Sequence, residues 1–132
     1  QGQRVELCGV DDPKCGGSMW SDQLSAAAKA ADPDCLAVLL SHRPERVEDY
    51  RAYDFDLVLS GHAHGGQWRL PGLVNGLLAP DQGFFPAYAG GLYRLDENTD
   101  LVVSRGLARE STRVPRIFNP PELVIIDVTP AE

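Results

Sequence analysis

Two short apolar runs in the first half of the chain have the length and composition of buried strands. Residues 36–40 (Leu-Ala-Val-Leu-Leu) and 57–59 (Leu-Val-Leu) are apolar throughout, and polar or glycine residues follow each run. Bounded apolar runs of this length, rich in β-branched and aliphatic residues, are typical of strands in a sheet core. Residues 4–10 alternate loosely between polar and apolar and predict a further strand, which runs into a loop at residues 11–13.

Helical spacing appears between these strands. Apolar residues recur at positions i, i+3, i+4 and i+7 from Leu24 to Ala31, so we predict a helix with Ser21 as its N-cap and a stop at residues 32–33 (Asp-Pro). A second helix is predicted over residues 44–53, because proline suits the first helical position. Strand, helix and strand in succession indicate a βαβ unit.

The second half of the chain is broken into short segments by proline and glycine. Residues 92–95 and 101–104 flank a polar stretch and predict a hairpin, and residues 122–128 predict a last strand rich in Ile and Val. The fold class is therefore mixed α/β, with a βαβ start and an antiparallel finish. At 132 residues and 43% hydrophobic content, the chain 1–132 is one domain at most, with a real core.

Composition excludes some classes of function. The net charge of −7 argues against a nucleic-acid partner, which attracts basic proteins. The chain contains no run of 18 apolar residues and no secretory leader pattern. Its cysteines, Cys8, Cys15 and Cys35, match no zinc spacing. Because it starts with Gln1 and its single methionine is Met19, we expect it to be part of a longer protein.

All three histidines follow predicted strands. His42 comes just after residues 36–40, and His62 and His64 come just after residues 57–59. Ligands gather at the carboxyl ends of strands in α/β sheets. In extended backbone, side chains two residues apart point to the same side, so we expect His62 and His64 to project together. Three neutral imidazoles suit zinc, iron or manganese. The alternative is that each histidine is an ordinary surface residue.

Basic and aromatic residues provide weaker candidates. Trp68 and Arg69 follow residues 61–67, which we call the histidine loop, and could either line a pocket or cover a sheet edge. Four arginines near the end of an acidic chain suit a phosphate or an anionic headgroup, or else form a solvated loop face: Arg105, Arg109, Arg113 and Arg116.

Residues 61–67 (Gly-His-Ala-His-Gly-Gly-Gln) and residues 39–44 (Leu-Leu-Ser-His-Arg-Pro) carry a resemblance to a known family. They closely resemble the closing motifs of the calcineurin-like metallophosphoesterases. With residues 70–71 (Leu-Pro) and 104–107 (Ser-Arg-Gly-Leu), the chain is similar to the small bacterial branch that acts as phosphodiesterases. The resemblance extends over nearly the whole chain, from about Val5 to the segment that begins at Asn119.

The resemblance implies a fold, an activity and a set of ligands. The fold would be a four-layer α/β/β/α sandwich of which this chain is the C-terminal half. The intact enzyme would hold two divalent metal ions (Mn, Fe or Zn), with His42 and His62 on one and His64 on the other. It would hydrolyse phosphodiester bonds through a hydroxide activated by the two metals, and no nucleophilic side chain would be needed. His62 would also be catalytic, near the leaving group.

The other family ligands are absent from this sequence. An Asp-x-His, a Gly-Asp and a Gly-Asn-His segment are all absent from it, and we expect Asp11 and Asp12 to cap a loop rather than bind metal. The missing N-terminal half is therefore an expected partner, and the isolated chain is expected to be inactive. The alternative is a non-catalytic metal-binding or self-associating module, because half a sheet exposes an edge and an apolar face. The sequence leaves the parent's location open between the cytoplasm and the membrane surface.

Overall fold

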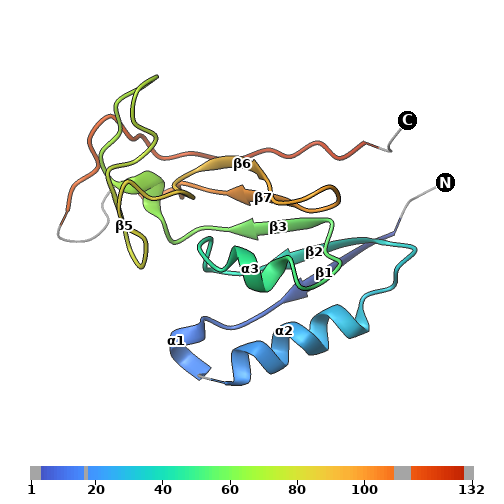
Figure 1. Ribbon diagram of the computed structural model, residues 1–132. Coiled ribbons are helices and arrows are strands. Elements are labelled where there is room, and N and C mark those ends of the chain that lie inside the picture. Colours follow the sequence, from blue (N-terminus) through green and yellow to red (C-terminus); the bar gives the residue numbers. More distant parts are fainter. Residues whose placement is uncertain (1–3, 17, 109–113, 130–132) are drawn as a thin grey trace.

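A five-stranded sheet forms the centre of the computed structural model, which describes residues 4–16, 18–108 and 114–129 (Figure 1). The strand order is β1-β2-β3-β7-β6; the first four strands are parallel, and β6 is antiparallel to β7. The fold is mixed α/β with a βαβ start and an antiparallel hairpin, as predicted. The strands are β1 (Val5–Gly9), β2 (Leu36–Leu40), β3 (Leu57–Ser60), β6 (Gly91–Arg94) and β7 (Asp100–Val103).

One face of this sheet is covered by helices. The helices are α1 (Pro13–Gly16), α2 (Met19–Ala30) and α3 (Val47–Tyr50). Trp20 and Leu24 of α2 and Tyr50 of α3 pack with Leu39 and Val58 of the sheet, all nearly or fully buried. Side chains alternate between the two faces of a strand, so β2 and β3 each send one set of residues into this core.

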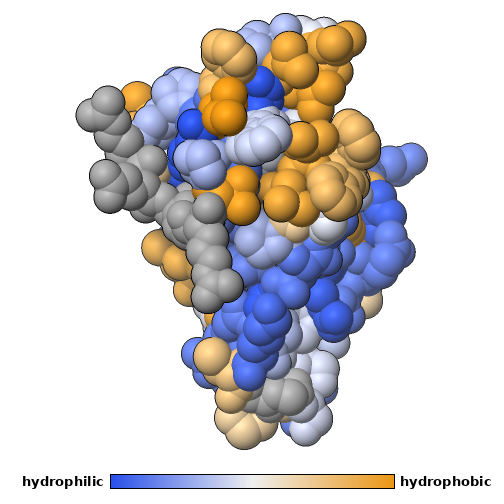
Figure 2. Space-filling model, turned by 90° about the vertical axis from the view of Figure 1, so that its left-hand side faces the viewer, coloured by the Kyte–Doolittle hydropathy of each residue, from blue (hydrophilic) through white to orange (hydrophobic). Residues whose placement is uncertain are grey.

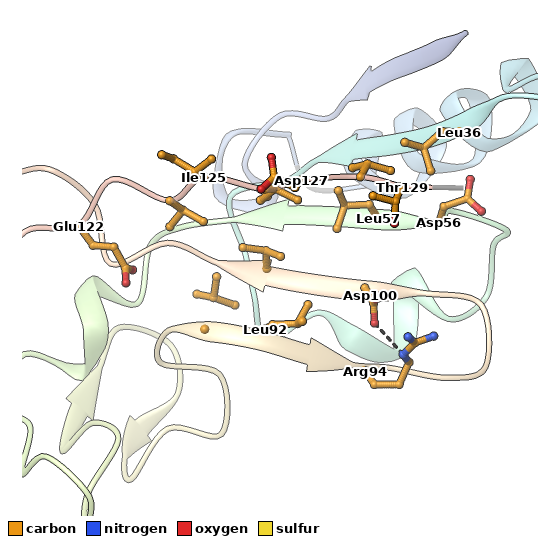
Figure 3. A pocket seen from close by; sticks show the side chains of 16 residues that line it. Leu36, Asp56, Leu57, Leu92, Arg94, Asp100, Glu122, Ile125, Asp127 and Thr129 are labelled. Carbon is orange, nitrogen blue, oxygen red and sulfur yellow. Dashed lines mark ion pairs between the residues drawn. The ribbon is translucent and has the colours of Figure 1, made fainter. Parts of the chain in front are cut away.

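The other face of the sheet is largely open. Leu7 and Leu92 are each 70% exposed. The segment 114–129 runs across this face and leaves a groove of about 640 Å³ between itself and the strands (Figure 3). Leu57 and Leu92 line the groove from the sheet, and Ile125 lines it from the segment. This groove is formed by the outer sheet face, and no histidine lines it.

Two helix predictions need correction. Helix α2 starts at Met19 with Ser18 as its N-cap residue, and Ser21 instead lies inside the first turn, where its hydroxyl donates to Ser18 O at 2.8 Å. The second helix is limited to Val47–Tyr50 and does not span residues 44–53. The Tyr50 hydroxyl donates to Arg43 O at 2.5 Å, which holds the preceding loop against the end of the sheet.

The predicted last strand is also wrong. Residues 122–128 form no strand, although Glu122 N–H donates to Gly106 O at 3.1 Å. A strand requires a neighbour that takes up its backbone groups, and no described strand pairs with this segment.

Two small elements lie at the carboxyl end of the sheet. The 3-10 turn η1 (His64–Gly66) follows β3, and strands β4 (Leu78–Ala79) and β5 (Gly83–Phe84) form a short hairpin beside it. The tip of that hairpin carries Asp81. Among the described residues, no helix has the length and apolar character needed to cross a membrane.

Candidate functional site

The carboxyl ends of β2 and β3 bring two of the three histidines together. The two strands are parallel neighbours with Leu40 opposite Leu59, so the loops that follow them leave the sheet side by side. The rings of His42 and His62 have centroids 4.6 Å apart and planes at 60°. Figure 2 views the molecule onto this end, where hydrophilic residues gather below an upper region rich in hydrophobic residues.

The histidine loop is folded rather than extended. His62 (φ 62°) and His64 (φ 48°) both adopt left-handed backbone, and Ala63 between them is right-handed helical. The expectation that an extended backbone would point both imidazoles to one side is therefore wrong. Non-glycine residues with positive φ are uncommon, and such strained backbone often occurs at functional sites.

Close packing around the loop accounts for two of its three glycines. Gly65 and Gly66 have φ values of 65° and 67°, and a Cβ at either position would overlap a neighbour. At Gly65 the neighbour is Asn119, which is only 3% exposed. Asn119 Nδ2 donates to His64 O at 2.7 Å and to Gln67 O at 3.1 Å. Asn119 therefore stabilises the loop through two hydrogen bonds. Sequence analysis did not predict this role, because Asn119 lies far from the loop in the sequence.

A buried arginine organises the charges around His62. Arg43 is 4% exposed, and its Nε and Nη2 donate to the two oxygens of Asp12 at 2.8 and 2.7 Å. Arg43 also pairs with Asp81, whose other oxygen accepts from Lys14 Nζ at 3.0 Å. Asp81 Oδ2 lies 2.8 Å from His62 Nε2. Of these charged groups, Arg43 and Asp81 contact His62 directly, and Arg43 Nη1 also lies 3.6 Å from Glu45 Oε1.

The pKa values of both carboxyl groups reflect these contacts. The hydrogen bond from Arg43 lowers the pKa of Asp12 to about 2. Hydrogen bonds from His62 and Lys14 hold the pKa of Asp81 well below its ordinary value. Asp12 also accepts from Lys14 N–H at 2.8 Å, in agreement with the predicted loop cap, but its pairing with Arg43 was not foreseen.

His62 Nε2 has two neighbours of opposite type. Arg43 Nη1 lies 3.1 Å from it and can only donate, whereas the Asp81 carboxylate can only accept. A protonated Nε2 therefore donates to Asp81, and an unprotonated Nε2 accepts from Arg43. Either tautomer has a partner, so the ring orientation is fixed in both.

Partial burial favours the neutral form of the other two histidines. Burial, followed by the charge of His62, lowers the pKa of His42. Burial, followed by the charge of Arg116, lowers the pKa of His64. A neutral imidazole is the form that binds metal.

A compact three-donor group occurs elsewhere. Within the described residues, the only group of three potential ligands whose donor atoms all lie within 4.8 Å is Glu6, Asp32 and Cys35. This group contains none of the histidines. Burial raises the pKa of the Cys35 thiol, and Asp32 pairs with Arg4 at 2.8 Å. Glu6 of β1 accepts from Asp32 N–H at 2.8 Å, so these contacts explain the group as the link between β1 and the turn before β2.

The remaining candidates have mixed outcomes. Trp68 is 42% exposed and its Nε1 donates to Pro115 O at 3.0 Å, so it packs along the segment 114–129, which we call the returning segment. Arg105 pairs with Glu122. Arg109 and Arg113 lie outside the described residues.

Comparison with known proteins gives relatives in one family. The chain is 42% identical over 92 residues to a metallophosphoesterase of Campylobacter jejuni. This match covers 70% of this chain and 22% of the relative. It is 33% identical over 105 residues to the phosphodiesterase YaeI of Escherichia coli, and this match covers 80% of this chain and 35% of the relative. It is 32% identical over 102 residues to the UDP-2,3-diacylglucosamine pyrophosphatase LpxG of Chlamydia muridarum, and this match covers 72% of this chain and 30% of the relative. No family model and no solved structure matches.

These similarities define the class of protein. The chain belongs to the metallophosphoesterase family, as the motifs at residues 39–44 and 61–67 predicted. It spans less than half the length of each of these three relatives.

Proposed function

We propose that the whole protein containing this chain is a metal-dependent phosphoesterase that hydrolyses phosphodiester bonds, with His42, His62 and His64 among its metal ligands. The observation that carries the proposal is the approach of the His42 and His62 rings to 4.6 Å at neighbouring strand ends. Its relatives, which include a phosphodiesterase and a pyrophosphatase, support the same class of reaction.

The donor set fits a divalent transition metal. His42 and His62 are close enough to serve one ion, and burial keeps His42 and His64 toward the neutral form. When bound, two ions would supply Lewis-acid activation of the phosphate ester and of water. The chain's own residues orient the histidines: Asp81 and Arg43 contact the His62 ring, and Asn119 donates to the backbone of His64.

We further propose that the isolated chain is inactive. A dinuclear centre needs a carboxylate that keeps two like-charged ions together, and Asp12 and Asp81 are already paired with Arg43. The remaining ligands would come from the part of the domain outside these residues. We also propose that this part packs on the open sheet face, where Leu7 and Leu92 are exposed.

Hydrolysis and metal content of the whole protein test this function. Protein loaded with manganese should hydrolyse bis(p-nitrophenyl) phosphate, and His62→Ala or His64→Ala should lower kcat/KM by at least about tenfold. Each variant should also bind less metal and keep its fold, because metal ligands at an open site contribute little to the core.

Arg94→Gln is the matched control, because Arg94 lies on β6 and pairs with Asp100, away from the histidines. It should keep both turnover and metal. Full turnover and full metal content in His62→Ala would contradict the assignment.

A further inference from the structure

Three arginines from separate segments meet beside the histidine loop. Arg69 follows the loop, Arg105 follows β7, and Arg116 lies in the returning segment; we call them the arginine cluster. A Cβ added at Gly90 would lie 2.8 Å from Arg105 Cγ and 3.3 Å from Arg69 Nη1, so these two side chains share one space. Arg116 Nη2 donates to Arg105 O at 2.5 Å, which places the third guanidinium next to them.

Backbone pairing connects this cluster to the histidines. Arg69 N–H donates to Ile117 O at 3.0 Å, and Ile117 N–H donates to Gln67 O at 3.1 Å. The segment that carries Arg116 therefore lies directly against the end of the histidine loop. Asn119 of the same segment binds the backbone of His64.

Positive charge exceeds negative charge in the cluster. Within the described residues one carboxylate pairs with it, that of Glu122, which accepts from Arg105 Nη2 at 2.7 Å. The side-chain acceptor for Arg69 is the neutral amide of Asn75. The chain has 19 acidic and 12 basic residues, so the scarcity of carboxylates here is a local feature and not a result of composition.

Several donors of the cluster are buried without an acceptor. In the described part of the chain, Arg69 Nη1, Arg116 Nε and Arg116 Nη1 are inaccessible to solvent and have no hydrogen-bond partner. A buried donor that makes no hydrogen bond is costly, particularly on a charged group. A solvated basic face would not bury these atoms, so the arrangement indicates a binding position for an anionic acceptor.

We propose that Arg69, Arg105 and Arg116 form a binding site for a phosphoryl oxyanion beside the histidine loop. The planar fork of a guanidinium matches two oxygens of such a group, and three forks around one space can bind a tetrahedral anion. The identification of that anion as part of the substrate rests on the proposed function, but the oxyanion site stands on the arginine geometry alone.

Phosphate binding to the whole protein without metal tests this site. Protein stripped with EDTA is titrated with inorganic phosphate by isothermal titration calorimetry. The wild type should bind it, and Arg116→Gln and Arg69→Gln should each weaken binding by about tenfold or more, as expected for loss of a charge-assisted hydrogen bond. Glu122→Gln should strengthen binding, because it removes the competing carboxylate.

Two controls make the outcome specific. Arg4→Gln removes an equal charge at a residue that is 73% exposed and pairs with Asp32, so it should leave phosphate binding unchanged. His62→Ala should also leave binding unchanged, which separates this site from the proposed metal centre. Dimethyl phosphate is titrated in parallel; arginine-dependent binding of either probe supports the site, and the tighter probe assigns a terminal phosphoryl group or a diester.

The proposal is overturned if the wild type binds neither probe. It is also overturned if Arg116→Gln and Arg69→Gln, shown to be folded by circular dichroism, bind phosphate as well as the wild type. Equal weakening by Arg4→Gln would assign the effect to net charge and would likewise overturn it. A Glu122→Gln variant that binds more weakly contradicts the role of Glu122 as a competitor.

Discussion

At the scale of single residues, the His42 and His62 rings lie 4.6 Å apart at the end of the sheet, and Arg43 and Asp81 both contact His62. His42 and His62 could be placed together because each follows a strand by two residues, and parallel strands end at the same edge. Arg43 and Asp81 could not be paired, since 38 residues separate them and the hairpin that carries Asp81 is only two residues long on each side. The assignment of His42, His62 and His64 to metal stays a prediction.

Gly65→Ala should destabilise the protein by about 2–3 kcal/mol, because the new Cβ meets Asn119 and alanine disfavours left-handed backbone. Gly61→Ala in the same loop is the control: a Cβ there has no neighbour within 4 Å, and the expected change is below about 0.5 kcal/mol. Urea unfolding followed by circular dichroism measures both. Equal stability of the two variants would contradict the packing of Asn119 on Gly65.

At the scale of elements, hydrophobic patterns predicted the strands that lie inside the sheet. Residues 36–40 and 57–59 are β2 and most of β3, and the hairpin of residues 92–95 and 101–104 is β6 and β7 within one residue. The pattern failed at residues 122–128 because an apolar, β-branched run states only a preference for extended backbone. Whether it becomes a strand depends on a neighbour that local sequence does not specify.

Val58→Asp should prevent folding. Val58 is fully buried in the middle of β3, and an unpaired carboxylate there should cost more than about 4 kcal/mol, a large part of the stability of a small domain. Leu92→Asp on the outer face of β6, where the side chain is 70% exposed, should change the free energy of unfolding by less than about 1 kcal/mol. Thermal unfolding compares them, and a cooperative transition in Val58→Asp at the wild-type temperature would refute the burial of β3.

The attachment of the returning segment should weaken in acid. The hydrogen bond from Arg105 lowers the pKa of Glu122 in the folded chain, so its contribution is present above the unfolded pKa and is lost as the pH falls through the folded value. Because the pair is partly exposed, the expected size is below about 1 kcal/mol.

Hydrogen exchange measures this attachment. The amide of Glu122, corrected for intrinsic rates, should lose protection as the pH falls from about 6 to about 3, and Glu122→Gln should remove the pH dependence. The amide of Leu101 in the buried strand β7 should keep its protection over the same range. Parallel loss at both amides would indicate general acid unfolding instead.

At the scale of the whole molecule, the sheet has one covered and one open face. The helices α2 and α3 bury the first face, and the segment 114–129 covers the second only in part (Figures 1 and 3). Exposed apolar surface on this scale favours association with another surface. We propose that the rest of the domain provides this second surface in the whole protein.

The isolated chain should therefore self-associate. Sedimentation velocity should show a mass that rises with concentration, and a Leu7→Lys, Leu92→Lys double variant should shift the chain toward monomer, because both side chains lie on the open face. Leu73→Lys is the control, since Leu73 is 81% exposed in a turn outside the sheet. A wild-type chain that stays monomeric at all concentrations would contradict the proposal.

The strands of the central sheet, the family and the positions of the three histidines after strands followed from the sequence alone, because strand patterns and short motifs are local properties of the chain. The tertiary structure decided which charges surround His62, how Asn119 fastens the glycine loop, and that the arginine cluster has unpaired buried donors among the described residues. Those contacts join segments far apart in the chain, and their partners are selected by packing and by the need to satisfy buried polar groups, which no local pattern encodes.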